Sequence, residues 1–238
     1  IEMAPFLYQE SYGSAQIRGN ADLQNGYNYN IDLRYELFEK NGDMLSITAY
    51  YKHLKAPIER VQTLSGGSAV HSFRNADNGM ATGVEIEFRK EIVKDLRFGV
   101  NGSYMYTNVK LPEGGAYTNS QRALQGASPY LANADLTYSP AFSNDRQLSV
   151  ALLYNLQGPR IHSVGISGLG DIKQQPVHTL NFTGSYRFNR RFAVKLQVND
   201  LLNQDILFKQ EVPTTGDKVE VERFRKGTGF EVGFSYDL

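Results

Sequence analysis

The sequence predicts an all-β fold in which antiparallel strands form a segment of a transmembrane β-barrel. Apolar and polar residues alternate with a period of two through nine segments, the pattern of strands with one oily and one polar face. Most segments run for about 10 residues, the length that a tilted strand needs to cross a bilayer. The connections between them alternate between short and long. We predict no helix and no sequence repeat.

The alternation defines the predicted strands in chain order. In the first, Ile31 and Leu33 flank Asp32, and the same rhythm continues on both sides. The nine segments are 27–37, 45–51, 84–89, 96–107, 130–138, 148–154, 180–188, 191–199 and 230–238. A tenth strand is expected within 1–10, where Pro5 weakens the pattern because proline cannot donate to a strand ladder.

Full charges occupy the polar face in the middle of these segments. They are Arg34, Glu36, Glu85, Glu87, Arg97 and Lys195. In a soluble sandwich this face would contact bulk water, whereas in a large barrel it would line a wet lumen or contact a plug. The alternation alone is compatible with both architectures.

The lengths of the connections favour the barrel. Short connections lie at 39–43, 91–94, 139–146 and 189–190, and long ones at 56–79, 108–126, 157–175 and 203–226. Strict alternation places every tight turn at one end and every long loop at the other, as in outer-membrane barrels with periplasmic turns and extracellular loops. Aromatic residues cluster near the short turns, where an interfacial girdle is expected. They are Tyr35, Phe38, Tyr138, Phe142, Tyr186, Phe188 and Tyr236.

Composition excludes several classes of protein. The 238 residues carry 25 basic and 25 acidic side chains, so nothing indicates a nucleic-acid partner. There is no cysteine, which excludes disulfides and thiolate metal sites. The chain opens on Ile1 without a signal peptide or an apolar run long enough for a transmembrane helix. We therefore expect it to be a piece of a longer protein.

The last predicted strand ends in "EVGFSYDL". It resembles the C-terminal signal that the barrel-assembly machinery reads in outer-membrane proteins, carried here by Glu231, Gly233, Tyr236 and Leu238. Phenylalanine is the commoner last residue of that signal, so Leu238 departs from it. A closing strand at the chain end also suits a barrel, because a barrel leaves no free edge.

Several stretches together resemble the C-terminal barrel of TonB-dependent outer-membrane receptors, in the subgroup with a carboxypeptidase-regulatory-like N-terminal domain. They are "EMAPFLYQE", "GNADLQNGYNYNIDLRYELF", "MLSITAYYKHLKAPIERV", "FRNADNGMATGVEIEFRK", "ALQGASPYLANADLTY" and "NDLLNQ". One departure is Ala21, where the subgroup has proline. The resemblance covers essentially all of 1–238.

This resemblance implies a 22-stranded barrel, of which 1–238 supplies about nine or ten strands. It implies an outer-membrane receptor of a Gram-negative bacterium that imports a scarce nutrient with energy transduced by TonB. The plug and the segment that contacts TonB would lie outside this chain. Outer-membrane lipid and lipopolysaccharide would surround the barrel. No cofactor is implied, and the substrate is left open among siderophores, vitamins, glycans and peptides.

Candidate binding residues lie in the long connections. We expect Arg74, Tyr117, Arg122, Arg160 and His162 to contact a ligand. Among them, Tyr117, Arg122 and Arg160 suit an anionic one. The basic run at 222–227 is expected at the rim, near lipopolysaccharide phosphates. The glycine-rich 165–171 lacks a following Lys-Ser/Thr pair, so we expect a flexible loop rather than a phosphate site.

No enzyme is predicted. The four histidines have no metal-site spacing, and no catalytic set is visible among them, so no metal is expected either. Two alternatives remain open at this point. A soluble all-β module that binds sugars would place the oily strand face in one core. A plain porin or an outer-membrane enzyme would share the barrel but not the receptor motifs.

Overall fold

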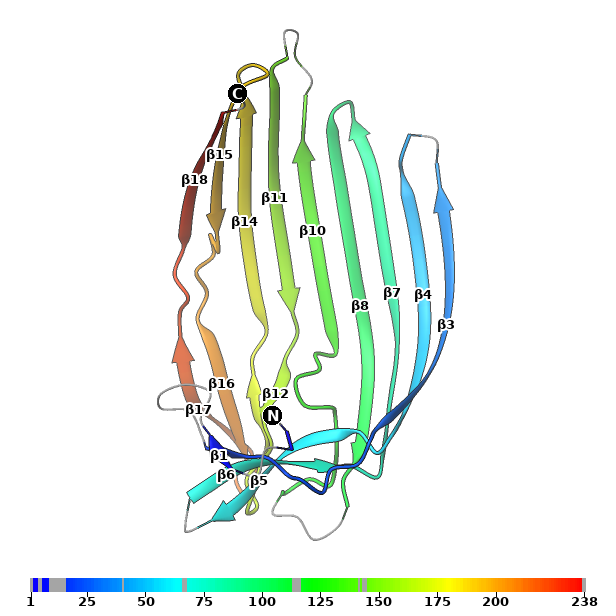
Figure 1. The fold of residues 1–238 in the computed structure, drawn as a ribbon, viewed down its shortest axis with the longest axis vertical. Helices are drawn as coiled ribbons and strands as arrows, with labels where there is room; N and C mark the ends of the chain where they lie inside the picture. Colours follow the sequence, from blue (N-terminus) through cyan, green and yellow to red (C-terminus); the bar gives the residue numbers. More distant parts are fainter. Residues whose placement is uncertain are drawn as a thin grey trace.

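A computed structural model describes residues 2–236 except 4–5, 9–15, 40, 66–67, 113–116, 141 and 143–144. The described residues form strands and no helix, so they contain no helix that could cross a membrane. Nine long strands make one antiparallel sheet in chain order (Figure 1). They are β3 (Tyr27–Phe38), β4 (Met44–Lys55), β7 (Asn78–Val93), β8 (Leu96–Lys110), β10 (Tyr130–Tyr138), β11 (Gln147–Gln157), β14 (Val177–Arg187), β15 (Phe192–Asn199) and β18 (Gly229–Tyr236). The two-residue β9 (Gln121–Arg122) pairs beside β8.

Each of the nine predicted segments overlaps one of these long strands, so the alternation predicted the sheet correctly. The largest difference is β7, which begins at Asn78 rather than at 84, because "GMATG" carries no clear alternation. Within 1–10 the described part forms only β1 (Leu7–Tyr8), which pairs with β2 (Ile17–Arg18) outside the long sheet. A short strand thus lies where a tenth was expected, and among the described residues it does not join the long sheet.

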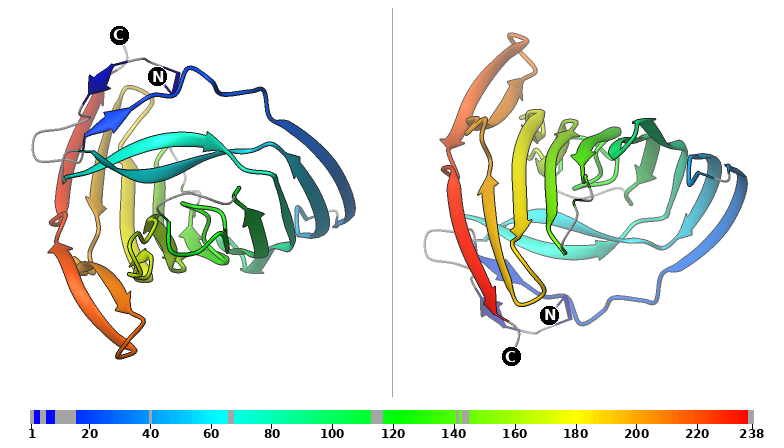
Figure 2. Two further views of the ribbon diagram at one scale, coloured as in Figure 1. Left: turned by 90° about the horizontal axis from the view of Figure 1, so that it is seen from below. Right: turned by 90° about the horizontal axis from the view of Figure 1, so that it is seen from above.

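Two small sheets that the sequence did not predict lie at the long-loop end. One contains β1, β2 and the hairpin of β5 (Ile58–Ser65) and β6 (Ser68–Asn75). The other contains β12 (Arg160–Ser163), β13 (Ile172–Gln174), β16 (Ile206–Val212) and β17 (Asp217–Phe224). We call these two sheets the rim. Seen from either end, the long sheet is an open arc, and the β5–β6 hairpin extends across its concave side (Figure 2).

The register shows which side chains share a face of the arc. Val100 lies opposite both Phe88 and Ala134, so apolar side chains continue across neighbouring strands. On the other face an amide ladder crosses β8, β10 and β11. Asn133 Nδ2 donates to Asn101 Oδ1 at 2.7 Å, and Asn155 Nδ2 donates to Asn133 Oδ1 at 2.6 Å.

The polar face is the concave one. Val109 of β8 is 1% exposed and packs in one cluster with Val61 of the β5–β6 hairpin, which lies on the concave side. Side chains alternate along a strand, so Asn101 and Ser103 share the side of Val109. The apolar side chains of the long strands therefore cover the convex face. They are widely exposed there, Ile31 at 72% and Phe234 at 72%.

The four short turns and the end of β18 lie at one end of the sheet, and the long connections lie at the other (Figure 1). Tyr236 lies at the short-turn end because it pairs opposite Phe192. The predicted separation of short and long connections is therefore confirmed. The aromatic residues predicted to form a girdle lie near the short-turn end. Tyr186 and Phe188 meet edge to face there, with ring centroids 4.6 Å apart.

Labelling of intact cells should reveal which end is outside. Asn119 and Ser167 are exposed at the long-loop end, and Arg146 is exposed in a short turn. We expect single cysteines at 119 and 167 of the full-length protein to react with a membrane-impermeant maleimide. A cysteine at 146 should react only after the outer membrane is permeabilised. The reverse pattern would invert the assigned topology.

Candidate ligand-binding rim

A cluster of titratable side chains lies where the β5–β6 hairpin faces β12 and β17. Its members are Arg60, His71, Arg160, His162 and Glu222, and we call them the rim cluster. The charge of Arg60 influences the pKa of both His71 and His162, so these groups lie within electrostatic range of one another. Arg160 and His162 were expected from the sequence, whereas Arg60 and Glu222 were not, because no sequence motif joins residues about 100 positions apart.

Both imidazoles of the rim cluster are poor bases. Burial, helped by Arg60 and His162, lowers the pKa of His71 to about 4. Desolvation also lowers the pKa of His162, where Glu222 opposes the shift and Arg60 and Arg160 add to it. Both rings are therefore neutral at pH 7, and the two arginines outweigh the single Glu222 carboxylate. The rim cluster carries a net positive charge.

Neighbouring side chains hold the cluster in place. The His162 ring meets Phe208 edge to face at 4.7 Å, and Gln125 Nε2 donates to the His162 carbonyl at 2.7 Å. Arg160 Nε donates to Gln174 Oε1 at 2.8 Å. Arg60 Nε is buried and has no hydrogen-bond partner among the described residues. A buried guanidinium donor without an acceptor is costly, so an acceptor from a ligand or a water would stabilise it.

Arg122 was expected to contact a ligand, but the fold places it in an internal ion pair. Its Nη1 lies 3.0 Å from Glu59 Oε2, and the two side chains are only 3% and 7% exposed. Burial raises the pKa of Glu59, and the Arg122 guanidinium opposes that rise. The pair ties β9 to the β5–β6 hairpin. A ligand role for Arg122 stays a prediction, and its surroundings favour a structural one.

The other two expected residues also lie at the long-loop end. Tyr117 bridges to Ile166 and packs on the apolar cluster that contains Val61 and Val109. Its hydroxyl is buried without a hydrogen-bond partner among the described residues. Arg74 lies on β6 opposite Glu59 in the hairpin register. The structure thus brings Arg160 and His162 into one cluster. Tyr117 packs on the neighbouring apolar cluster, while Arg122 pairs with Glu59 and Arg74 lies opposite Glu59.

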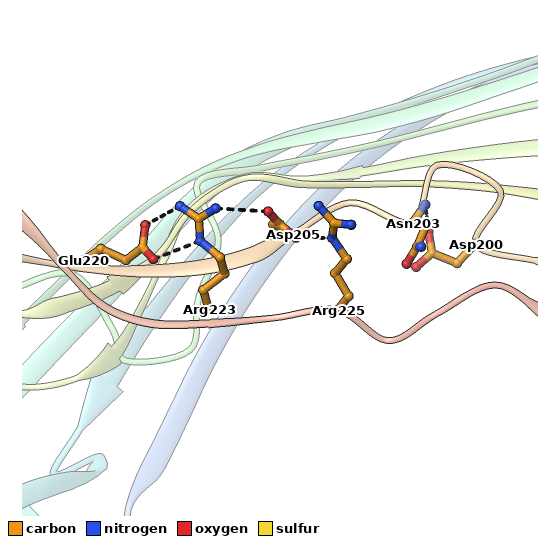
Figure 3. Close-up of polar contacts among 6 residues, drawn as sticks. All are labelled: Asp200, Asn203, Asp205, Glu220, Arg223 and Arg225. Atoms are coloured by element: carbon orange, nitrogen blue, oxygen red, sulfur yellow. Dashed lines mark hydrogen bonds and ion pairs between the residues drawn. The ribbon is translucent and has the colours of Figure 1, made fainter.

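The basic run at 222–227 has little free charge. Arg223 donates two hydrogen bonds to the Glu220 carboxylate, from Nε at 2.8 Å and from Nη2 at 2.6 Å (Figure 3). Its Nη1 lies 3.2 Å from Asp205 Oδ2. Arg225 Nε also pairs with Asp205. The hydrogen bond from Arg225 is the main reason that the pKa of Asp205 lies below its usual range. Glu220 and Asp205 therefore balance both arginines.

The motif "NDLLNQ" forms the joint between β15 and β16. The Asp200 amide donates to Asn181 Oδ1 at 2.8 Å, and the Asn203 amide donates to Asp200 Oδ1 at 3.2 Å. Asp200 and Asn203 have positive φ angles of 55° and 44°, a conformation that Asp and Asn tolerate better than most residues. The His178 amide donates to Gln204 Oε1 at 2.8 Å. These hydrogen bonds hold the connection between β15 and β16 against β14. They give the residues of the motif a structural role.

The glycine-rich 165–171, which we expected to be a flexible loop, forms a hydrogen-bonded turn. The Gly165 amide donates to Asp171 Oδ1 at 2.8 Å, and Asp171 is buried. A Cβ at Gly165 would lie 2.1 Å from the Leu169 carbonyl oxygen, so only glycine fits. The turn is also held to Glu211 of β16, whose carbonyl accepts from the Gly170 amide at 3.0 Å. This segment serves the packing of the rim.

The C-terminal signal residues lie along β18. Glu231, Gly233 and Tyr236 pair opposite Gln197, Lys195 and Phe192 of β15. Leu238 lies outside the described residues. Their role in assembly stays a prediction. Within the part of the chain that the structure describes, no group of three or more His, Asp or Glu side chains is placed to hold a metal ion.

A family model described as "Outer membrane protein beta-barrel family" matches residues 2–236. No curated protein matches the sequence. Among solved structures, a mutant of the ferric enterobactin receptor PfeA from Pseudomonas aeruginosa has a TM-score of 0.64 at 18% identity, over 93% of this chain and 32% of its own. The ferric yersiniabactin uptake receptor FyuA from Yersinia pestis has a TM-score of 0.61 at 17% identity, over 90% and 30%. The copper transporter OprC has a TM-score of 0.62 at 14% identity, over 92% and 32%.

Proposed function

Because the chain belongs to the outer membrane protein β-barrel family, we propose that it forms the C-terminal barrel part of an energised outer-membrane receptor that imports a scarce nutrient. The observation that carries the proposal is the fold, which follows receptor barrels over nine-tenths of this chain. The chain spans about a third of the length of those receptors. A plug and the contact with TonB would lie in the rest of such a receptor.

The rim supports a role in capturing the nutrient. We propose that an anionic small molecule, such as a metal chelate, binds between the β5–β6 hairpin and β12. Arg60 and Arg160 would donate to its acid or phenolate oxygens, and His162 would pack against it. Among the described residues the buried Arg60 Nε donor lacks an acceptor, and a ligand oxygen would supply one. The neutral His71 would lie behind these donors.

The exposed convex face argues against the soluble alternative. Leu33, Phe230 and Phe234 are 76%, 74% and 72% exposed on long strands. A soluble sandwich would bury such a face against a second sheet, and no second sheet covers it among the described residues. Transport also fits better than catalysis, since the similar solved proteins are named as receptors and a transporter.

An uptake assay tests the proposal. Cells that carry the full-length gene should accumulate one of a panel of radiolabelled ferric siderophores, and accumulation should stop when the proton gradient is collapsed. Arg60→Ala combined with Arg160→Ala should lower uptake at limiting substrate about tenfold, because two charge-assisted contacts are lost. Arg146→Ala combined with Arg190→Ala, at the short-turn end, is the control. Uptake that survives collapse of the gradient would contradict energised import.

A further inference from the structure

A hollow lies on the concave face of the sheet near its short-turn end. It has a volume of about 600 Å³ and extends across β11, β14, β15 and β18, which are neighbours in the long sheet (Figure 1). Small residues form much of its lining, namely Ser149, Ser185, Ala193 and Gly233, and the cations Arg187 and Lys195 join them. Among the described residues, no acidic side chain lines it. We call it the cationic hollow.

The register places these side chains on the concave face. Ser149 lies on the same side of β11 as Asn155, which belongs to the amide ladder of that face. Ser185 lies opposite Ser149, and Lys195 lies opposite Ser185. Arg187 follows two residues after Ser185 on β14, so it is on the same side. The cationic hollow therefore opens toward the interior of the barrel.

Both cations of the hollow lack a counter-charge. Among the described residues, neither Arg187 nor Lys195 forms an ion pair, whereas Arg34 and Arg89 of the same face each pair with a glutamate. Gly233 lies opposite Lys195, so no side chain of β18 covers the lysine from that position. Two cations on one side of a sheet repel each other, and an anion between them would remove the repulsion.

The strands that lead to the cationic hollow carry no acid. β11, β14 and β15 contain neither Asp nor Glu. By contrast, β3 contains two acidic residues and β7 contains three. The concave face is thus divided into an acidic part on β3 and β7 and a part without carboxylates on β11, β14 and β15. An anion that moves along the wall meets the least repulsion on the second part.

Two acids flank this part of the wall without entering it. Asp135 of β10 lies opposite Leu153 of β11, but its carboxylate lies over Gly99 of β8, where it would clash with any Cβ. β8 and β11 are on opposite sides of β10, so the carboxylate is turned away from β11. Glu231 of β18 lies opposite Gln197 of β15, so β15 separates it from β14.

β11 runs from the rim cluster to the cationic hollow. Arg160 of the rim cluster begins β12, three residues after Gln157 ends β11. Ser149 lies near the other end of β11, beside the hollow. The 11 residues of β11 span about 34 Å. Between the two ends, the concave face of β11 and β14 offers uncharged donors such as Asn155 and Thr183. Cations therefore lie at both ends of an uncharged, mostly polar surface.

We propose that the cationic hollow is a second anion site, which the anionic nutrient occupies after it leaves the rim cluster and before it enters the periplasm. Arg187 and Lys195 are diagonal neighbours on β14 and β15, about 7–8 Å apart along the backbone, so one ligand can contact both. They donate to its acid or phenolate oxygens, and the hydroxyls of Ser149 and Ser185 donate beside them. The inference rests on the proposed function and adds where on the wall the nutrient passes.

Charged thiol reagents test the site in the purified full-length receptor without any nutrient. Relative to their rates with free cysteine, a negatively charged methanethiosulfonate should modify the Ser185→Cys variant about tenfold faster than a positively charged one. Adding Arg187→Gln and Lys195→Gln should abolish that preference. The matched control is Ser103→Cys on the same face, opposite Glu85, which should prefer the positively charged reagent.

Uptake tests whether the nutrient uses the site. Arg187→Gln combined with Lys195→Gln should lower the maximal rate of ferric siderophore uptake about tenfold, while the affinity of binding to de-energised cells stays within about twofold. Arg89→Gln combined with Arg97→Gln removes two cations from the same face near the acids of β7. This control should leave the maximal rate within about twofold of the wild type.

Three results would overturn the proposal. One is an equal normalised rate of both reagents at Ser185→Cys. Another is an unchanged maximal rate of uptake in the Arg187 and Lys195 variant, and the third is an equal loss in the Arg89 and Arg97 control. Failure of the wild type to take up any of the panel would contradict the proposed function instead, and the labelling ratio would then decide the anion site by itself.

Discussion

Arginine at Val100 or Val232 should destabilise the protein by about 2–4 kcal/mol, the cost of a cation on the lipid face near the bilayer midplane. Val100 lies four residues after Leu96 and six before Tyr106, so it is near the middle of the expected apolar band. Val232 lies four residues before Tyr236 and opposite Leu196, at a comparable depth. An arginine at either position could not bring its guanidinium to water without distorting the bilayer.

Arginine at Ser103 or Ser235 should cost much less. Both serines lie on the concave face, where Ser103 borders a hollow shared with Glu85 and Glu87. A guanidinium there meets water and carboxylates. The free energy of unfolding of the full-length protein in lipid vesicles, measured by denaturant titration, separates the two faces. Equal costs for valine and serine positions would contradict the assignment of the convex face to lipid.

The long strands could be predicted because lipid on one side and a wet interior on the other impose a strict period of two. Each residue from Tyr27 to Leu37 follows that rule, and β3 contains all of them. The connections obeyed an equally simple constraint, since tight turns can close only neighbouring antiparallel strands. Family motifs such as "NDLLNQ" were informative about kinship, although the structure gives that motif a packing role.

The rim could not be predicted in the same way. Its strands contact protein or water on both faces, so no solvent boundary imposes a period on their side chains. Ile17 pairs with His71, which is more than fifty residues away in the sequence. The pKa of His71 is in turn influenced by His162, a further ninety-one residues along. Such contacts depend on how the long strands place their loops. Arg122 illustrates the difficulty, because a loop cation and a buried ion-pair partner look alike in sequence.

Removal of the Arg122 guanidinium should have the largest effect of any single change at the long-loop end. Arg122→Ala would leave Glu59, at 7% exposure, as an uncompensated buried carboxylate. Breaking a buried pair from one side costs about 3–5 kcal/mol. The loss should be local, so amide hydrogens of β5 and β6 should exchange faster in the full-length protein while those of β10 and β11 stay protected.

The chain supplies a matched control in Arg190, which pairs with Asp145 at 2.8 Å but is 83% exposed. Arg190→Ala should cost at most about 1 kcal/mol, because solvent already screens that pair. The double change Arg122→Met with Glu59→Leu should recover most of the loss, since it removes both buried charges. Equal losses of unfolding free energy for Arg122→Ala and Arg190→Ala would show that burial does not determine how much an ion pair stabilises the fold.

The pH dependence of the Arg122→Ala variant distinguishes a buried charge from lost packing. Burial raises the pKa of Glu59 and Arg122 opposes that rise, so removal of Arg122 should raise the pKa further. The folded variant then binds a proton more readily than the unfolded chain, and its stability should fall as pH rises above the ordinary glutamate pKa of 4.5. The cost of Arg122→Ala should therefore be smaller at pH 5 than at pH 8. A cost that is the same at both pH values would mean that the guanidinium acts by filling space rather than by neutralising Glu59.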